Sequence, residues 1–229
     1  MAPGTDTMEL LQLADACFPA GGFAFSNGLE SLAKLGYVKS MGDFEQYLAC
    51  HLEQITSAEI PFLNSAFLCA DLPIGSGFLE VAREWDAWLF MPTQRKASLA
   101  QGQAWARALE ETYDQPGIRG VRPEFLRHGI PLHFLMIFAA TLKAAGKSLA
   151  DIQRLILHMA LRDQLGAAVR LGLMGSLQAQ RMHRKFIGVG EDCLTRRRDW
   201  KFGLAARAAP MIDMGQASHP YLYSKLFQS

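Results

Sequence analysis

The chain has 229 residues, of which 50% are hydrophobic and 20% are charged, a composition that excludes a disordered or collagen-like chain. Its net charge of +1 hides an uneven distribution, because residues 1–94 carry 12 acids and 3 bases whereas residues 95–229 carry 10 acids and 20 bases. We therefore expect one compact domain, residues 1–229, with a strongly dipolar charge distribution.

Apolar residues recur at helical spacing along most of the chain, and no alternating strand pattern is found. Pro61 is expected to kink or split the long third segment, and residues 114–131 are predicted to be a loop with one short helix at Glu124–His128. The sequence thus predicts an all-α domain of about eight to ten helices. The main predicted helices are Met8–Cys17, Asn27–Leu35, Asp43–Ala70, Phe78–Phe90, Pro92–Tyr113, Pro131–Ala145, Ser148–Ala168, Ala167–Arg184 and Cys193–Arg207.

Targeting signals are not evident. No apolar stretch reaches the roughly 18 to 20 residues that span a bilayer. The N-terminus lacks a basic segment and carries Asp6, Glu9 and Asp15, which is unlike a secretory signal. The 4 cysteines are scattered without a CxxC pair, as is typical of reduced thiols. These features predict a cytoplasmic protein without a membrane segment.

Catalytic and metal-binding motifs are also not found. The 6 histidines form no HxH or HExxH pair, so no metal site is predicted. The glycine-rich stretch at residues 75–80 follows no strand, which removes the geometry that a nucleotide phosphate needs. Ser26 and Ser98 lie outside any GxSxG motif and have no base partner that the sequence reveals. We expect no catalytic residues and no enzyme activity.

The basic C-terminal half leaves a second function class open. Arg196, Arg197 and Arg198 are consecutive, and Trp200 and Phe202 follow them. Clustered cations with stacking aromatics are typical of nucleic-acid binding, although such a run is more often a solvated helix face. A helical nucleic-acid-binding protein is therefore the alternative interpretation.

Two stretches are unusual for a generic core. Residues 13–30 end a helix and then place Phe18, Phe23 and Phe25 around glycines, which indicates either a helix corner or an apolar contact surface. Further along, Arg154, His158 and Arg162 share one helix face, and the simplest interpretation is a basic helix face exposed to solvent. Arg170 lies in the apolar run 166–174, where an unpaired charge would be costly, so we expect it to have a partner or a function.

Four stretches of the chain, which include most of these residues, resemble sequence patterns of the UreF family of urease accessory proteins. The segment LLQLADACFPAGGFAFSNGLES at residues 10–31 is similar to the family pattern D-x-x-x-P-x-G-x-x-x-x-S-x-G-L-E. QRKASLAQG at residues 94–102 resembles the mid-chain ER-x-x-S-x-x-x-G helix, and AAVRLGLMG at 167–175 resembles the A-V-[RK]-L-x-P-L-G segment. The terminal HPYLYSKLFQS at 219–229 resembles the H-x-x-L-Y-S-R-L-F-x-S tail.

The resemblance implies an all-α chaperone without catalytic activity that forms a homodimer. Its implied partners are the accessory protein UreD/UreH, the GTPase UreG and the urease apoprotein, and nickel is handled by this assembly while the chain itself binds no cofactor stably. Nucleic acid and membranes are not implied as partners. Residues 213–229 are implied to be a partner-docking C-terminal tail.

Site residues follow from the resemblance position by position. Those implied at the dimer interface are Phe18, Gly21, Gly22, Phe23, Ser26 and Gly28. Those implied to face the GTPase are Arg154, His158 and Arg170. Those implied to bind UreD/UreH are the tail residues His219, Tyr221, Leu222, Tyr223, Leu226 and Phe227.

Some positions depart from the family pattern. An acidic residue is common where Gln94 stands, Pro where Leu173 stands, and Arg where Lys225 stands. His or Tyr is more usual at Phe25. Lysine lacks the planar fork of arginine, so recognition of a carboxylate by the tail is expected to be weaker.

Overall fold

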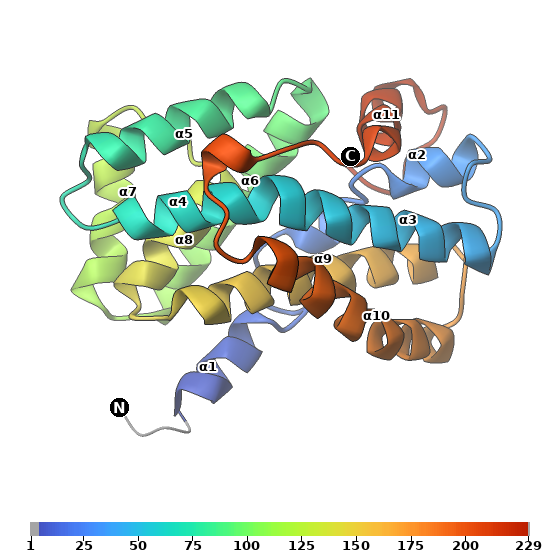
Figure 1. Cartoon of the computed structure of the whole chain (residues 1–229), viewed down its shortest axis with the longest axis horizontal. Coiled ribbons are helices and arrows are strands. Elements are labelled where there is room, and N and C mark those ends of the chain that lie inside the picture. The colour runs from blue at the N-terminus through green and yellow to red at the C-terminus, as the bar shows by residue number, and fades with distance from the viewer. Residues whose placement is uncertain (1–4, 229) are drawn as a thin grey trace.

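The computed structural model describes residues 5–228 and confirms the all-helical prediction, because the described residues contain no strand (Figure 1). The α-helices run in chain order through one compact body. They are α1 (Thr5–Leu13), α2 (Leu29–Lys34), α3 (Met41–Gln54), α4 (Ile60–Cys69), α5 (Ser76–Trp88), α6 (Pro92–Thr112), α7 (Pro116–Arg127), α8 (Phe134–Ala144), α9 (Leu149–Arg170), α10 (Ser176–Arg197) and α11 (Pro210–Ser218).

The long segment predicted at residues 43–70 is divided as expected, but the division precedes Pro61. A π-helical turn, η2 (Ile55–Glu59), separates α3 from α4, and Pro61 lies in the first turn of α4. At the other end, the side chain of Ser40 accepts from the backbone N–H of Asp43, which completes a capping box and fixes the start of α3.

Residues 116–127 were expected to be mostly loop and instead form the helix α7. Pro116 lies at its first turn, where proline is tolerated. Ile118, Val121 and Phe125 recur at helical spacing, are buried and pack toward α8. Burial of this apolar stripe outweighs the low helix propensity that the prolines and glycines suggest.

The predicted boundaries near the C-terminus also change. Helix α10 continues past Arg184 to Arg197 because Phe186, Cys193 and Leu194 extend its buried face. No separate helix covers residues 193–207; beyond α10 the chain forms the short 3-10 turn η3 (Phe202–Leu204). This connecting segment lies on α4 and η2, where the backbone N–H of Ala206 donates to the carbonyl of Ser57 at 2.9 Å.

Helix α8 is the centre of one half of the molecule and packs against α4, α6 and α7. Its residues from Leu135 to Leu142 are buried, and the Trp105 indole of α6 donates to Thr141 at 3.0 Å. Helix α6 approaches the start of α8 closely at Gly102, since a Cβ there would overlap the carbonyl oxygen of Leu132. Close backbone approach therefore requires glycine at this position.

Helix α9 organises the other half, where it packs against α3 and α10 and passes below the η1 turn, Gly22–Ala24. Tyr47 of α3 donates to the Gln164 side chain of α9 at 2.7 Å. Helix α11 and the end of the chain lie beside α2, on the far side of the body from α1 (Figure 1). The described part of the chain contains no helix long and apolar enough to cross a membrane.

Oppositely charged halves of the sequence pair with each other in the fold. Lys185 of α10 lies 2.7 Å from Glu45 of α3. Arg197 of α10 pairs with Glu53 of α3 at 2.6 Å. Lys147 pairs with Glu9 of α1 at 2.5 Å. Much of the basic excess of residues 95–229 is thus matched within the chain.

Candidate functional site

The glycine-rich corner, which we define as residues 18–28, leads from α1 into α2. Gly28 begins α2 with a left-handed φ of 90°, and a Cβ there would lie 2.9 Å from the backbone nitrogen of Gln216 in α11. Only glycine satisfies both the conformation and this close approach without strain. The corner therefore fixes how α2 meets α11.

The residues expected at a dimer interface differ in exposure. Phe23 is 62% exposed at the surface of the corner, whereas Phe18 is half-buried against Trp105, with ring centroids 5.3 Å apart. Ser26 and Gly28 are buried, and the Ser26 hydroxyl accepts from the backbone N–H of Glu30 at 3.3 Å. Of these side chains, Phe23 is the one most available to another molecule. Gly21 and Gly22 are partly exposed beside it.

The tail is folded against α2. His219 and Phe227 are buried near its two ends, Leu222 is half-buried, and Tyr221, Tyr223 and Leu226 are exposed. The short 3-10 turn η4 (His219–Tyr221) begins this segment. Two tyrosines and a leucine thus face solvent from a segment that the buried side chains of His219 and Phe227 hold in place.

The anchor is Glu30 of α2, a buried carboxylate that ends the first resembled pattern but was not predicted to be a site residue. Its oxygens accept from the backbone N–H groups of Leu226 at 2.7 Å and Phe227 at 3.1 Å. Lys34 donates to it at 2.8 Å, and the His219 Nε2 lies 3.2 Å away. Burial on its own would raise the pKa of Glu30, but the hydrogen bonds from Lys34 and the tail outweigh it and lower that pKa.

Arg170, at the end of α9, joins the corner to the tail. Its guanidinium carbon lies 3.8 Å from the ring centroid of Phe23 and 4.1 Å from that of Phe227. The same guanidinium donates to the carbonyl of Phe23. The partner expected for this charge is therefore a pair of aromatic rings and a carbonyl, an arrangement that favours a planar cation.

The structure brings together residues from three separately predicted sets, because Phe23, Arg170 and Phe227 form one cluster. Arg154 and His158 lie elsewhere, on the exposed face of α9 beside α10. Arg154 pairs with Glu191 at 3.1 Å, and His158 packs edge to face on His183 with ring centroids 5.2 Å apart. Arg170 is thus separate from the other two residues of its predicted set.

Arg154 and His158 border a groove of about 200 Å³ between α9, α10 and α3. Its floor is apolar and includes Leu52, Leu161 and Phe186. Burial lowers the pKa of His158, and the neighbouring His183 and Arg162 lower it further. The groove therefore combines an apolar floor with a neutral imidazole and an ion pair at its rim.

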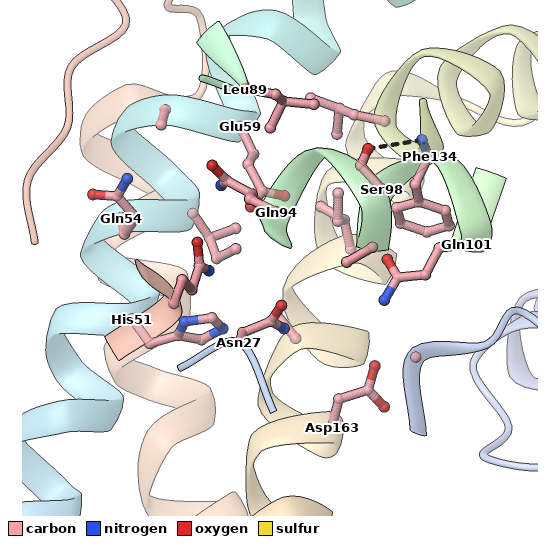
Figure 2. Close-up of a pocket in the computed structure, with 18 of the residues that line it drawn as sticks. Asn27, His51, Gln54, Glu59, Leu89, Gln94, Ser98, Gln101, Phe134 and Asp163 are labelled. Carbon is pink, nitrogen blue, oxygen red and sulfur yellow. Dashed lines mark hydrogen bonds between the residues drawn. The ribbon is translucent and has the colours of Figure 1, made fainter. Parts of the chain in front are cut away.

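A second cavity, of about 120 Å³, lies between α3, α6 and α9 (Figure 2). Within the described residues, both ring nitrogens of His51 and the Oε1 atoms of Gln94 and Gln216 find no hydrogen-bond partner. Figure 2 places His51, Gln54 and Asn27 on one side and Asp163 and Gln101 on another. Buried polar groups of this kind usually bind water or a polar ligand, so the cavity offers several polar atoms within a largely apolar lining.

Burial shifts the pKa values of three ionisable side chains that line this cavity. Burial lowers the pKa of His51 to about 4, which keeps its ring neutral near pH 7. Burial raises the pKa of Glu59 to about 7, an effect that Arg207 partly opposes. It also raises the pKa of Asp163, against the opposing effect of Arg162. Gln94, one of the departures from the resembled pattern, lines the same space.

Ser98 meets a histidine and a carboxylate that the sequence could not place beside it. The His133 Nδ1 lies 3.2 Å from the Ser98 hydroxyl and its Nε2 lies 2.8 Å from Asp86. The same hydroxyl accepts from the backbone N–H of Phe134, and Arg95 neutralises Asp86 at 2.6 Å. This network ties α5, α6 and α8 together. Because Nε2 of His133 donates to Asp86, Nδ1 of the neutral ring accepts from the Ser98 hydroxyl.

Other predicted features have structural partners too. Arg196 and Arg197 both pair with Glu53, so this part of the basic run is engaged within the chain. Nothing in the fold favours the nucleic-acid alternative.

No group of three or more His, Cys, Asp or Glu side chains capable of holding a metal occurs among the residues that the structure describes. Lys225 donates to the carbonyl of Pro220 at 3.0 Å.

Comparison with known proteins gives a consistent result. The model of the UreF family matches residues 38–186. The chain is similar to urease accessory protein F of Arabidopsis thaliana, with 31% identity over 95% of this chain and 90% of the relative. It is also similar to urease accessory protein UreF of Trichodesmium erythraeum, with 26% identity over 97% of both chains. The corner and the tail lie outside the residues that the family model matches.

Proposed function

The chain belongs to the UreF family of urease accessory proteins, and from this premise we propose that it is a non-catalytic chaperone of urease maturation. In this proposal it acts in the cytoplasm as a homodimer and binds the accessory protein UreD/UreH. It then recruits the GTPase UreG to the urease apoprotein. Nickel is the cargo of the whole assembly, and this chain contributes binding and positioning.

The placement of the exposed apolar side chains is the observation that supports an adaptor role most directly. Tyr221, Tyr223 and Leu226 face solvent from an anchored tail, and Phe23 faces solvent from the corner. Aromatic side chains in fixed positions are effective anchors in protein interfaces because little conformational entropy is lost on binding. We assign the tail to UreD/UreH and Phe23 to the homodimer.

The α9–α10 groove suits a different partner. Arg154 and His158 lie at its rim, well separated from Arg170 in the corner–tail cluster. Separate surfaces allow one chain to hold several proteins at once. We assign the groove to the GTPase, while Arg170 contributes by holding the corner and tail.

Co-purification tests the proposal. The chain is expressed with tagged UreD/UreH and UreG, and a stable complex of all three is expected at micromolar concentration. A variant with Tyr221→Ala and Tyr223→Ala should lose UreD/UreH, whereas Tyr37→Ala, which removes an exposed tyrosine in the turn after α2, should retain it. Absence of any complex with the wild-type chain would overturn the assignment.

A further inference from the structure

The cavity between α3, α6 and α9 contains polar atoms that form no hydrogen bond within the described part of the chain. These free atoms are both ring nitrogens of His51, Nε1 of Trp85, and the Oε1 atoms of Gln94 and Gln216, and all four residues line the cavity. His51 and Trp85 are each 4% exposed and Gln216 is 7% exposed, so bulk solvent does not reach them from outside. Buried polar atoms rarely stay unpaired in folded proteins, so these atoms are suited to bind a molecule inside the cavity.

Contacts with neighbouring residues hold two of these residues in position. The ring of His51 stacks on that of Tyr47, with centroids 6.0 Å apart and an angle of 13° between the planes. Tyr47 is fixed in turn, because its hydroxyl donates to Gln164 at 2.7 Å. The backbone carbonyl of Gln216 accepts from the hydroxyl of Thr93 at 3.1 Å. The free atoms are therefore positioned before a ligand arrives, which lowers the entropic cost of binding.

The free atoms need hydrogen-bond partners of both kinds. The Oε1 atoms of Gln94 and Gln216 only accept, whereas the indole Nε1 of Trp85 only donates. Burial lowers the pKa of His51 to about 4, so near neutral pH its ring offers one donor and one acceptor. A molecule that carries N–H groups beside a carbonyl oxygen matches this set, and a primary amide has this combination.

The charges around the cavity favour a neutral ligand. Asp163 pairs with Arg162 at 2.7 Å, and Asp213 pairs with Arg207 at 2.9 Å. The third carboxyl group in the lining belongs to Glu59, and burial raises its pKa to about 7, so it is mostly protonated at pH 6. An ion that entered at this pH would lose its hydration and meet no unpaired charge, which is costly. A neutral molecule avoids this cost.

Much of the remaining lining is apolar. Leu89, Phe134 and Met159 are among the side chains that enclose the free atoms. In the view of Figure 2, Gln94 lies between Leu89 and His51. The volume of about 120 Å³ is enough for several water molecules or for one small organic molecule. A few polar groups among apolar walls are typical of sites for small organic ligands.

We propose that this cavity binds a small neutral amide. Its N–H groups donate to Oε1 of Gln94 and Gln216, its carbonyl oxygen accepts from Nε1 of Trp85, and the His51 ring serves as donor or acceptor. The site lies inside one chain, so it does not depend on the protein partners assigned above. Urea is a suitable probe, because it carries two amino groups beside one carbonyl and can donate to both glutamines at once.

NMR spectroscopy of the full-length chain at pH 6 tests the site. Labelling with ¹⁵N gives an indole N–H signal for each of the 4 tryptophans, and Trp85→Phe identifies the signal of Trp85. Urea up to about 0.2 M, well below the concentrations that unfold most proteins, should shift this signal along a curve that saturates. Trp105 is the internal control, because its indole already donates to Thr141 at 3.0 Å and should shift little.

Two further probes give the matched comparison. Acetone has the shape of urea with methyl groups in place of the amino groups, so it should bind at least about tenfold more weakly. Equal saturation by acetone and urea would overturn the proposal, as would urea shifts that rise linearly and equally for Trp85 and Trp105. A saturating shift with ammonium chloride but not with urea would show that the ligand is a cation and would also overturn it.

Variants test the assigned acceptors. Gln94→Leu removes one acceptor oxygen at similar side-chain size and should weaken urea binding about tenfold. Gln103→Leu is the matched control, because Gln103 is exposed on the same helix and does not line the cavity. Gln216→Leu makes the same test from α11, and the Trp105 signal reports whether each variant is folded. Unchanged affinity in both cavity variants would refute the assignment.

Discussion

Arg170 lies against the ring of Phe227, with 4.1 Å between the guanidinium carbon and the ring centroid, and this contact joins the end of α9 to the end of the chain. A lysine at position 170 would keep the charge but lose the planar surface that stacks on two rings. The contact therefore requires arginine at position 170, and a positive charge alone does not satisfy it.

Arg170→Lys should release the tail more often while the body stays folded. A partly exposed cation–π contact contributes about 0.5 to 2 kcal/mol, so the open fraction should rise roughly fivefold. Trypsin cleavage after the exposed Lys225, followed by mass spectrometry, measures that fraction. Arg154→Lys, which changes an exposed ion pair with Glu191, is the control. Equal cleavage in both variants would contradict the stacking argument.

Phe23→Asp should convert the proposed homodimer into a monomer, because it places a charge in an apolar contact. Phe23 is mostly exposed in the single chain, so its replacement should not unfold the body. Phe90→Asp is a closely matched control, since Phe90 is equally exposed and also packs on an arginine, Arg207, at 4.5 Å. Sedimentation velocity should give monomer for the first variant and dimer for the second. An unchanged dimer in Phe23→Asp would reject this contact.

Arg154→Ala combined with His158→Ala should weaken recruitment of UreG while the dimer persists. Their ion pair and ring contact are exposed, so their loss should cost less than about 1 kcal/mol of folding stability. Pull-down with tagged UreG measures recruitment, and Arg181→Ala, on the exposed face of α10, is the control. Full recruitment by the double variant would show that the face of α9 carrying Arg154 and His158 is exposed to solvent and does not bind UreG.

Gly102→Ala should destabilise the fold strongly, because the added Cβ would overlap a backbone carbonyl that cannot rotate away. Overpacking of this kind costs about 1 to 3 kcal/mol or more. Gly188→Ala, in open space on α10, should instead stabilise by about 0.5 to 1 kcal/mol. Urea unfolding of the two variants gives the comparison, and a similar change in both would contradict the packing argument.

The helices were predictable because their signals are local. Caps such as Ser148, proline at first turns and the spacing of apolar residues act within a few residues of one another. Only the last turn of helix α7, near Glu124–His128, was predicted, because the stability of its earlier turns comes from packing on α8, which local propensity does not report.

The candidate site was predictable only in part. Phe23, Arg170 and Phe227 were each identified, yet the sequence did not indicate that they touch. Glu30 was missed as an anchor because two of its donors are backbone N–H groups, which leave no pattern in the side chains. The difference in charge between residues 1–94 and residues 95–229 likewise suggested external partners. Ion pairs between the two halves, such as Lys185 with Glu45, instead neutralise part of that charge within the chain.

His51 and Glu59, which line the same cavity, should give opposite dependences of stability on pH. The pKa of His51 falls from 6.5 to about 4 on folding, so only the unfolded chain binds its proton between these values. The free energy of unfolding should therefore decrease as the pH falls below 6.5. The pKa of Glu59 rises from 4.5 to about 7, so here the folded chain binds the proton and stability decreases as the pH rises through this window.

Between pH 4.5 and 6.5 the two effects oppose each other, and single variants should separate them. In Glu59→Gln the contribution of His51 remains, so stability should increase with pH more steeply than in the wild type. In His51→Leu the contribution of Glu59 remains, and the slope should change in the opposite direction. Each difference should approach, but not exceed, about 1.4 kcal/mol per pH unit. Urea unfolding at several pH values measures the slopes, and slopes that shift in the same direction in both variants would show that burial does not control these groups.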